Sequence, residues 1–151
     1  MKYTTSATIN KPLEEVVALY KNPDNYKYWM QGLERYKHLS GTPDTTGAKS
    51  EFIFQQGKRK LTMVQTIISS NLPEKQEVTY EAKKVFNKQS SKFEKVDEST
   101  TKYTVTNHFK FKGFMKMVAF FMPTAFRKQT AKYLNDFKTF VENHKTTDSN
   151  E

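Results

Sequence analysis

The stretch Gly113–His144, GFMKMVAFFMPTAFRKQTAKYLNDFKTFVENH, decides how the rest of the chain must fold. Residues with apolar or small side chains recur in it at steps of three and four, which places them on one stripe of an α-helix. They are Phe126, Thr130, Tyr133, Leu134, Phe137, Phe140 and Val141. Charged residues such as Arg127 and Glu142 fall on the opposite side. The pattern predicts a long amphipathic helix that needs an apolar surface to cover its stripe.

Pro123 divides this stretch into two helical pieces. Its ring nitrogen cannot donate a hydrogen bond to the carbonyl of Ala119, and proline disfavours helical geometry at the residue before it. We therefore expect a short piece from about Phe114 to Phe121, a kink at Met122–Pro123, and a main helix from about Thr124 to Asn143.

The short piece is almost entirely apolar, and lysines flank it. Packing into the core is the favoured interpretation of such a segment. The alternative is an exposed segment that contacts a membrane or acts as a flexible, methionine-rich gate at the mouth of a pocket. The candidate gate residues are Phe114, Val118, Phe121, Met122 and Pro123.

Upstream of Gly113, the hydrophobic pattern changes mostly to a period of two, which is typical of β-strands. A strand is predicted at Lys2–Ile9, followed by two short helical segments at Leu13–Tyr20 and Asp24–Met30. Six further strands are predicted at Leu33–Leu39, Lys49–Gln55, Leu61–Ser69, Val78–Ala82, Val85–Val96 and Lys102–Lys112. Short turns between them indicate antiparallel neighbours. The prediction is an α+β fold in which an antiparallel sheet packs on the long C-terminal helix.

The composition favours a single domain with an interior rich in aromatic residues. Only 36% of the 151 residues are hydrophobic, but 12 Phe, 8 Tyr and 1 Trp supply large rings, and such an interior is compatible with a cavity. We assign residues 1–145 to one domain and expect 146–151 to be a disordered tail. The chain has no cysteine, which excludes disulfides, thiolate metal sites and cysteine nucleophiles.

The net charge of +9 raises the question of an anionic partner. The basic residues are scattered, with short groups at Lys58–Lys60, Lys83–Lys84 and Arg127–Lys128. A general role in solubility is therefore favoured, and an anionic lipid surface is the alternative. No groove-reading helix motif predicts sequence-specific binding of nucleic acid. The N-terminal segment lacks the apolar run of a signal peptide, so we expect a cytoplasmic protein.

Alternation along the strands and the helix stripe predict which side chains face the space between sheet and helix. We predict ligand binding by Trp29, Phe52, Phe54, Met63, Tyr80, Asn107, Phe109, Phe126, Thr130 and Tyr133. Asn107 interrupts an apolar strand face, where an unpaired amide costs about 1–3 kcal/mol. A ligand or water can pair with this amide, or it can pair within the protein with Thr130 or Gln129. Gln65, Asn87, Gln89 and Ser91 can make the cavity partly polar.

No set of residues predicts catalysis, a metal site or a cofactor. The three histidines, His38, His108 and His144, have no Ser, Asp or Glu partner at a telling spacing. A tyrosine such as Tyr80 or Tyr133 that acts as an acid remains an alternative. We therefore predict no catalytic residue, no metal ligand and no cofactor.

Three local sequences carry a resemblance to a known family. They are the INKP sequence at Ile9–Pro12, the NPDNYKYWM sequence at Asn22–Met30 and the FRKQT sequence at Phe126–Thr130. With the order of elements, they resemble the helix-grip superfamily of START-like and polyketide cyclase/dehydrase-like (SRPBCC) domains, which includes the birch-pollen allergen family. Pro123 departs from the commoner pattern of that family.

The resemblance implies a curved, seven-stranded antiparallel sheet around the long helix, with a cavity between them. Members of the superfamily bind lipids, sterols, hormones, quinones or polyketides, and some are cyclases. We therefore expect a protein that binds or transports a hydrophobic small molecule, lipid-like or aromatic, and we favour a carrier over an enzyme. The alternatives are a cyclase/dehydratase-like enzyme and a basic protein- or membrane-interaction module without catalysis. No catalytic residue is shared across the superfamily, so none is assigned here.

Overall fold

The computed structural model describes residues 1–145; the tail expected at 146–151 lies outside the described residues. The elements are β1 (Lys2–Ile9), α1 (Leu13–Lys21), η1 (Pro23–Asn25), α2 (Tyr26–Trp29), β2 (Leu33–Ser40), β3 (Lys49–Gln56), β4 (Arg59–Asn71), β5 (Lys75–Ala82), β6 (Val85–Asp97), β7 (Thr100–Phe111), α3 (Phe114–Phe121) and α4 (Pro123–Asn143). No helix within residues 1–145 is long and apolar enough to cross a membrane.

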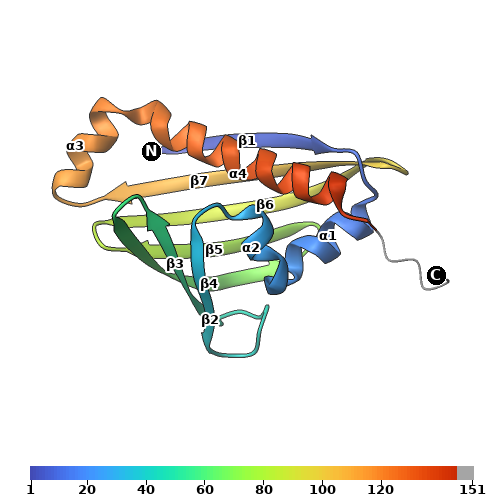
Figure 1. Ribbon diagram of the computed structural model, residues 1–151, viewed down its shortest axis with the longest axis horizontal. Helices are drawn as coiled ribbons and strands as arrows, with labels where there is room; N and C mark the ends of the chain where they lie inside the picture. The colour runs from blue at the N-terminus through green and yellow to red at the C-terminus, as the bar shows by residue number, and fades with distance from the viewer. Residues whose placement is uncertain (146–151) are drawn as a thin grey trace.

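The strands form one seven-stranded antiparallel sheet in the order β1-β7-β6-β5-β4-β3-β2. Strands β2 to β7 pair with their neighbours in the chain, and β1 closes the far edge by pairing with β7, with Tyr3 opposite Asn107. The sheet curves, α4 runs beside β1, and α1 and α2 lie near its C-terminal half (Figure 1). The predicted α+β helix-grip fold is confirmed.

The strands are longer than the hydrophobic pattern predicts, because the backbone ladder continues through polar residues up to tight turns. β5 begins at Lys75 rather than Val78, and β4 runs from Arg59 to Asn71. The turn between β3 and β4 is tight because Gly57 has a φ of 60°, a left-handed conformation that glycine adopts without steric cost. Hydrophobic alternation therefore locates the strands but not their ends.

The kink predicted at Met122–Pro123 separates two helices. Met122 has φ −130° and ψ 54°, outside the helical region, and Pro123 is the first residue of α4. Proline suits this position, since the first N–H groups of a helix have no partner within the helix. The predicted bounds of the short helix are confirmed, and the main helix begins one residue earlier than expected.

The C-terminal half of α4 packs tightly against the sheet and against α1 and α2. Phe137 has no exposed surface. Its ring centroid lies 4.9 Å from that of Trp29, 5.7 Å from that of Tyr20 and 5.6 Å from that of Tyr103. The other buried members of this cluster are Ile9, Val16, Phe93, Val105, Leu134 and Val141. This end of the sheet–helix interface is therefore filled by side chains.

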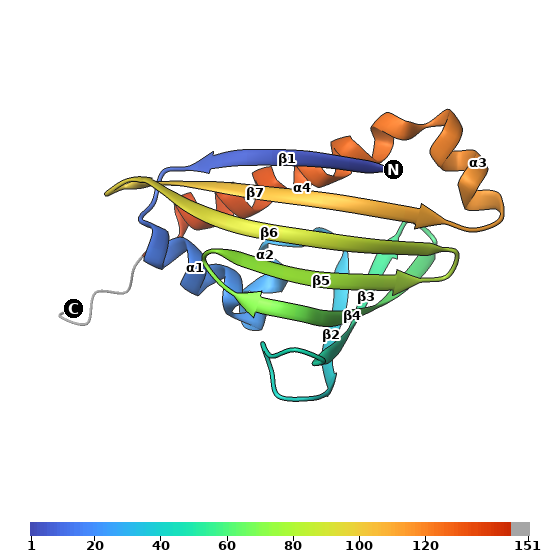
Figure 2. The ribbon, with the colours of Figure 1, turned by 180° about the vertical axis from the view of Figure 1, so that it is seen from behind.

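The expectation that the segment before Pro123 packs into the core is wrong. The side chains of α3 and its C-terminal neighbour are largely exposed, with exposed fractions of 65% for Phe114, 78% for Phe120 and 72% for Phe121. The helix begins past the last residue of β7 and projects from the end of the molecule (Figures 1 and 2). An almost entirely apolar sequence indicates that burial of the helix would be favourable, but it does not indicate whether any surface covers it.

Candidate ligand-binding cavity

A cavity of about 640 Å³ lies between the concave face of the sheet and the N-terminal half of α4. Strands β3 to β7 contribute its wall on one side, and α4 contributes Phe126, Thr130 and Tyr133 on the other. The cavity exists because the packed cluster around Phe137 holds the helix away from the sheet, while the side chains nearer Phe126 do not fill the gap.

All ten side chains predicted to face this space lie in the cavity wall. The strand residues do so because side chains two positions apart share one face, as Phe52 and Phe54 do on β3. The same argument extends to Ser50 and Ala82, which also line the cavity and which our sequence prediction did not include. Wall residues from the short helix α2 and the edge strand β2, such as Tyr26 and Tyr36, carry no such periodic signal.

The candidate gate residues take a different position. None of them lies in the cavity wall, and Met115 is the residue of α3 that does. Side chains leave a helix in all directions within one turn. Neighbouring residues of α3 can therefore face opposite ways: Met115 lies in the cavity wall, whereas Phe114 faces solvent. Because α3 has only 8 residues, nearly all of them apolar, the sequence pattern does not indicate which side of the helix faces the cavity.

A chain of hydrogen bonds joins β1, β6 and β7 to α4 at the cavity wall. Asn87 Nδ2 donates to Asn107 Oδ1 at 2.9 Å, and Asn107 Nδ2 donates to Thr130 Oγ1 at 3.2 Å. The hydroxyls of Tyr3 and Thr130 lie 2.7 Å apart, and both contact the carbonyl of Phe126. Of the two solutions considered for the Asn107 amide, the structure shows pairing within the protein, with Thr130.

A second polar pair lies on the sheet side of the cavity. Gln65 Nε2 donates to the Tyr80 hydroxyl at 3.0 Å. Burial raises the pKa of Tyr80, and the neighbouring Tyr20 adds to the effect. Tyr80 therefore keeps its proton at neutral pH, and its O–H is available as a hydrogen-bond donor.

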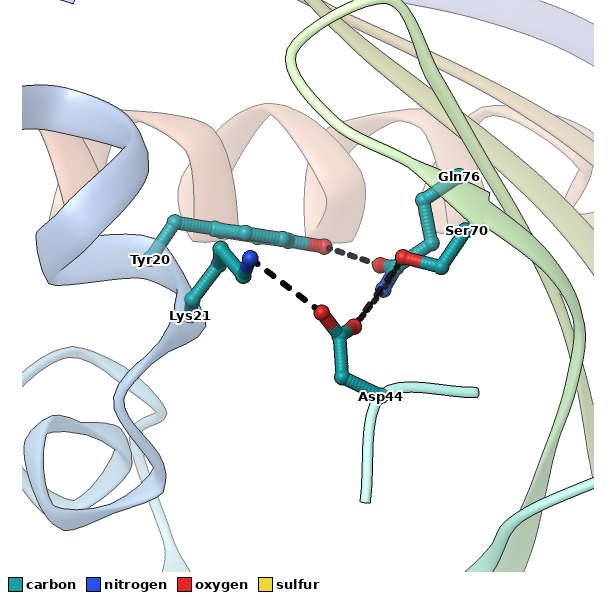
Figure 3. A network of polar contacts seen from close by, with 5 residues as sticks. All are labelled: Tyr20, Lys21, Asp44, Ser70 and Gln76. Atoms are coloured by element: carbon teal, nitrogen blue, oxygen red, sulfur yellow. Dashed lines mark hydrogen bonds and ion pairs between the residues drawn. The ribbon is translucent and has the colours of Figure 1, made fainter. Parts of the chain in front are cut away.

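The far rim of the cavity is held by a polar network around Asp44, in the loop between β2 and β3 (Figure 3). Asp44 Oδ1 accepts hydrogen bonds from Ser70 Oγ at 3.0 Å and Gln76 Nε2 at 3.2 Å, and Oδ2 forms an ion pair with Lys21 Nζ at 3.3 Å. Tyr20 donates to Gln76 Oε1 at 3.4 Å. The network ties the loop to α1 and to two strands, so this end of the cavity has a defined wall.

Acid–base and metal chemistry have little support in this wall. Among the residues that the structure describes, Asp44 is the carboxylate that lines the cavity, and both of its oxygens are engaged in the rim network. Within residues 1–145, no group of three or more His, Asp or Glu side chains is arranged to hold a metal ion. The polar groups of this wall are mainly hydroxyls, amides and cations beside aromatic rings.

The buried tyrosines predict how stability depends on alkaline pH. Burial raises the pKa of Tyr20, Tyr26, Tyr80 and Tyr103 above the ordinary value of 10.0. Above that value, the unfolded chain binds fewer protons than the native protein, so stability should fall as pH rises. Urea unfolding at a series of pH values should show this fall. The Tyr80→Phe variant should show a slope shallower by up to about 1.4 kcal/mol per pH unit, and an unchanged slope would contradict the assignment.

The sequence as a whole matches one family model. The model is described as polyketide cyclase/dehydrase and lipid transport, and it matches residues 1–142. The chain belongs to this family. The match spans both the sheet and α4, so it includes every element that lines the cavity. No curated protein sequence matches the chain.

Solved structures share the fold of this family member at low sequence identity. The Zhui aromatase/cyclase from Streptomyces sp. R1128 superposes with a TM-score of 0.80 at 10% identity, over 94% of this chain and 93% of that chain. Ara h 8.0201 gives a TM-score of 0.75 at 10% identity, over 95% and 99%. Norcoclaurine synthase from Thalictrum flavum, solved with dopamine and hydroxybenzaldehyde, gives 0.70 at 14% identity, over 97% and 89%. These likenesses show the fold, and the resemblance to the helix-grip superfamily is confirmed.

Proposed function

We propose that this protein binds and carries a largely apolar small molecule, lipid-like or aromatic, in the cavity between sheet and α4. The observation that carries the proposal is the unfilled space of about 640 Å³ beside a tightly packed core. Ligand pockets in proteins have volumes of about 300–1,000 Å³ and mostly apolar walls with a few polar groups. The cavity has these properties.

The driving force for binding would be the removal of apolar surface from water. Each square ångström of apolar surface buried contributes about 25 cal/mol, and Phe52, Phe54, Phe109 and Phe126 offer ring surface for such contact. Because the amide of Asn107 is engaged by Asn87 and Thr130, we assign the orienting role to the Tyr80 hydroxyl. Its free O–H would donate to an oxygen on the ligand.

An acid–base enzyme of the cyclase/dehydratase type is the second candidate. It is favoured by the family description and by the phenol of Tyr80 in the cavity wall. The raised pKa of Tyr80 makes it a weak proton donor, because its charged form is poorly solvated there. Binding without catalysis is therefore the function that the geometry supports best.

Filling the cavity should abolish binding. Ala82 lines the cavity and lies two residues from Tyr80 on the same face of β5, so Ala82→Trp would place an indole ring in the space that a ligand needs. We expect this variant to bind the apolar fluorescent probe 1-anilinonaphthalene-8-sulfonate at least tenfold more weakly, about 1.4 kcal/mol, in a fluorescence titration.

Glu81→Trp is the matched control, because Glu81 is the neighbouring residue on the exposed face of the same strand. It adds the same ring outside the cavity and should leave probe affinity unchanged. Extraction of the purified protein and mass spectrometry should also detect an apolar molecule bound to the wild-type protein and absent from Ala82→Trp. Equal probe binding by both variants would refute the proposal.

A further inference from the structure

One end of the molecule brings three separate segments together. The turn between β3 and β4, the turn between β5 and β6, and α3 all lie at this end (Figures 1 and 2). The backbone N–H of Lys112 donates to the carbonyl of Lys84 at 2.9 Å, which joins the start of the α3 segment to the β5–β6 turn. We call this region the α3 end.

The α3 end exposes large apolar side chains. Five of them belong to α3 and the residue after it, with exposed fractions between 56% and 78%: Phe114, Met117, Phe120, Phe121 and Met122. Single exposed apolar residues are normal on protein surfaces. Five within nine consecutive positions form an apolar patch, and such patches are typical of interaction sites.

The same end carries cations without acidic partners. Six exposed basic side chains at this end form no ion pair with any carboxylate in residues 1–145: Lys58, Arg59, Lys83, Lys84, Lys112 and Lys116. Lys60 pairs with Glu34 at 3.1 Å, and Glu81 is an exposed acid near the β5–β6 turn. Positive charge therefore dominates around the apolar patch.

We propose that the α3 end docks on an anionic phospholipid bilayer, with the apolar side chains of α3 inserted at the headgroup level and the surrounding lysines against lipid phosphates. A short helix with apolar side chains and flanking cations lies in the interface plane of a membrane rather than across it. A second copy of this chain fits the surface less well, because the cations of the two copies would face each other.

The docking surface is continuous with the cavity. Arg59, Lys83 and Met115 belong both to the α3 end and to the cavity wall. A ligand that leaves the cavity between these residues would enter the bilayer without crossing water. This last consequence rests on the proposed function, whereas docking itself does not.

Co-sedimentation with vesicles tests the proposal. The wild-type protein should bind vesicles of phosphatidylcholine with about a third phosphatidylglycerol at low salt, and at least tenfold more weakly when phosphatidylglycerol is omitted or salt is raised. Lys84→Glu/Lys116→Glu should weaken binding about tenfold or more. The Phe120→Ser/Phe121→Ser variant has the net charge of the wild type, and its vesicle binding should also be about tenfold weaker or more, because the inserted rings are lost.

The matched control for charge is Lys49→Glu/Lys102→Glu, which makes the same change in net charge at exposed positions away from the α3 end. It should bind almost as the wild type does. Equal loss in this control, or no vesicle binding by the wild type, would overturn the proposal. A dimer in sedimentation velocity that Phe120→Ser/Phe121→Ser abolishes would also overturn it, by showing that a second copy covers the patch. The Ala82→Trp variant should still bind vesicles, so failure of ligand binding and failure of docking are distinguishable.

Discussion

Replacing Phe137 with alanine is expected to lower the free energy of unfolding by about 3–5 kcal/mol. Phe137 has no exposed surface, and its ring meets those of Trp29, Tyr20 and Tyr103. The loss combines the transfer free energy of the buried ring with a new void that the three rings, which meet Phe137 edge to face, cannot close. Urea unfolding followed by circular dichroism measures the change.

The control for this substitution is Phe120→Ala, which removes the same ring from a site that is 78% exposed. It should change stability by no more than about 0.5 kcal/mol. A comparable loss in the two variants would mean that α3 is packed in solution, contrary to the exposed position described above. A small loss in Phe137→Ala alone would mean that the cluster around α4 rearranges to fill the void.

The second large effect is expected at Asn107. Asn107→Leu keeps the approximate volume of the side chain but removes both polar atoms, so that Asn87 Nδ2 loses its acceptor and Thr130 Oγ1 loses a donor. A buried donor without a partner costs about 1–3 kcal/mol, and with the lost bond to Thr130 the total should reach about 2–4 kcal/mol. Equilibrium unfolding in urea measures the change.

A double-mutant cycle with Thr130→Val tests whether the loss comes from this network. The two residues are hydrogen-bonded at 3.2 Å, so the double variant should lose less stability than the sum of the single variants, by about 0.5–3 kcal/mol. Asn135→Leu, at an exposed position on α4, is the control and should be nearly neutral. Strict additivity would show that Asn107 and Thr130 contribute independently.

The sequence predicts the fold because its two hydrophobic periodicities, one helical and one strand-like, each extend over many residues. The three- and four-residue spacing from Phe126 to Val141 places the apolar side chains on one side of a helix, which must be buried. The alternating strands have one apolar face, and this face is the surface that can bury it. The kink follows from Pro123 alone, because its ring nitrogen carries no proton and its ring restricts the preceding residue. These are local properties of the chain, and local properties can be read from the sequence.

The wall of the candidate site is predictable to the extent that it lies on those regular elements. Phe52, Phe54 and Phe109 follow from strand alternation, and Thr130 and Tyr133 follow from the helix stripe. Tyr3 does not stand out, because its role depends on Thr130, which lies more than a hundred residues later in the chain and bonds to its hydroxyl. Likewise, Asp44 gives no sign in the sequence that it ties a loop to Lys21 and Gln76.

Gly113–His144 shows where local reasoning stops. The sequence by itself determined that this stretch forms two helices with a break at Pro123, since hydrogen bonding and sterics within a few residues decide that. Only the tertiary structure decided where the space between α4 and the sheet is filled by side chains, at Phe137, and where it is left open, near Phe126. It also decided that α3 is exposed rather than buried. The reason is that burial depends on which distant segments pack against a surface. The apolar character of a segment indicates that its burial would be favourable, but not which segment, if any, buries it.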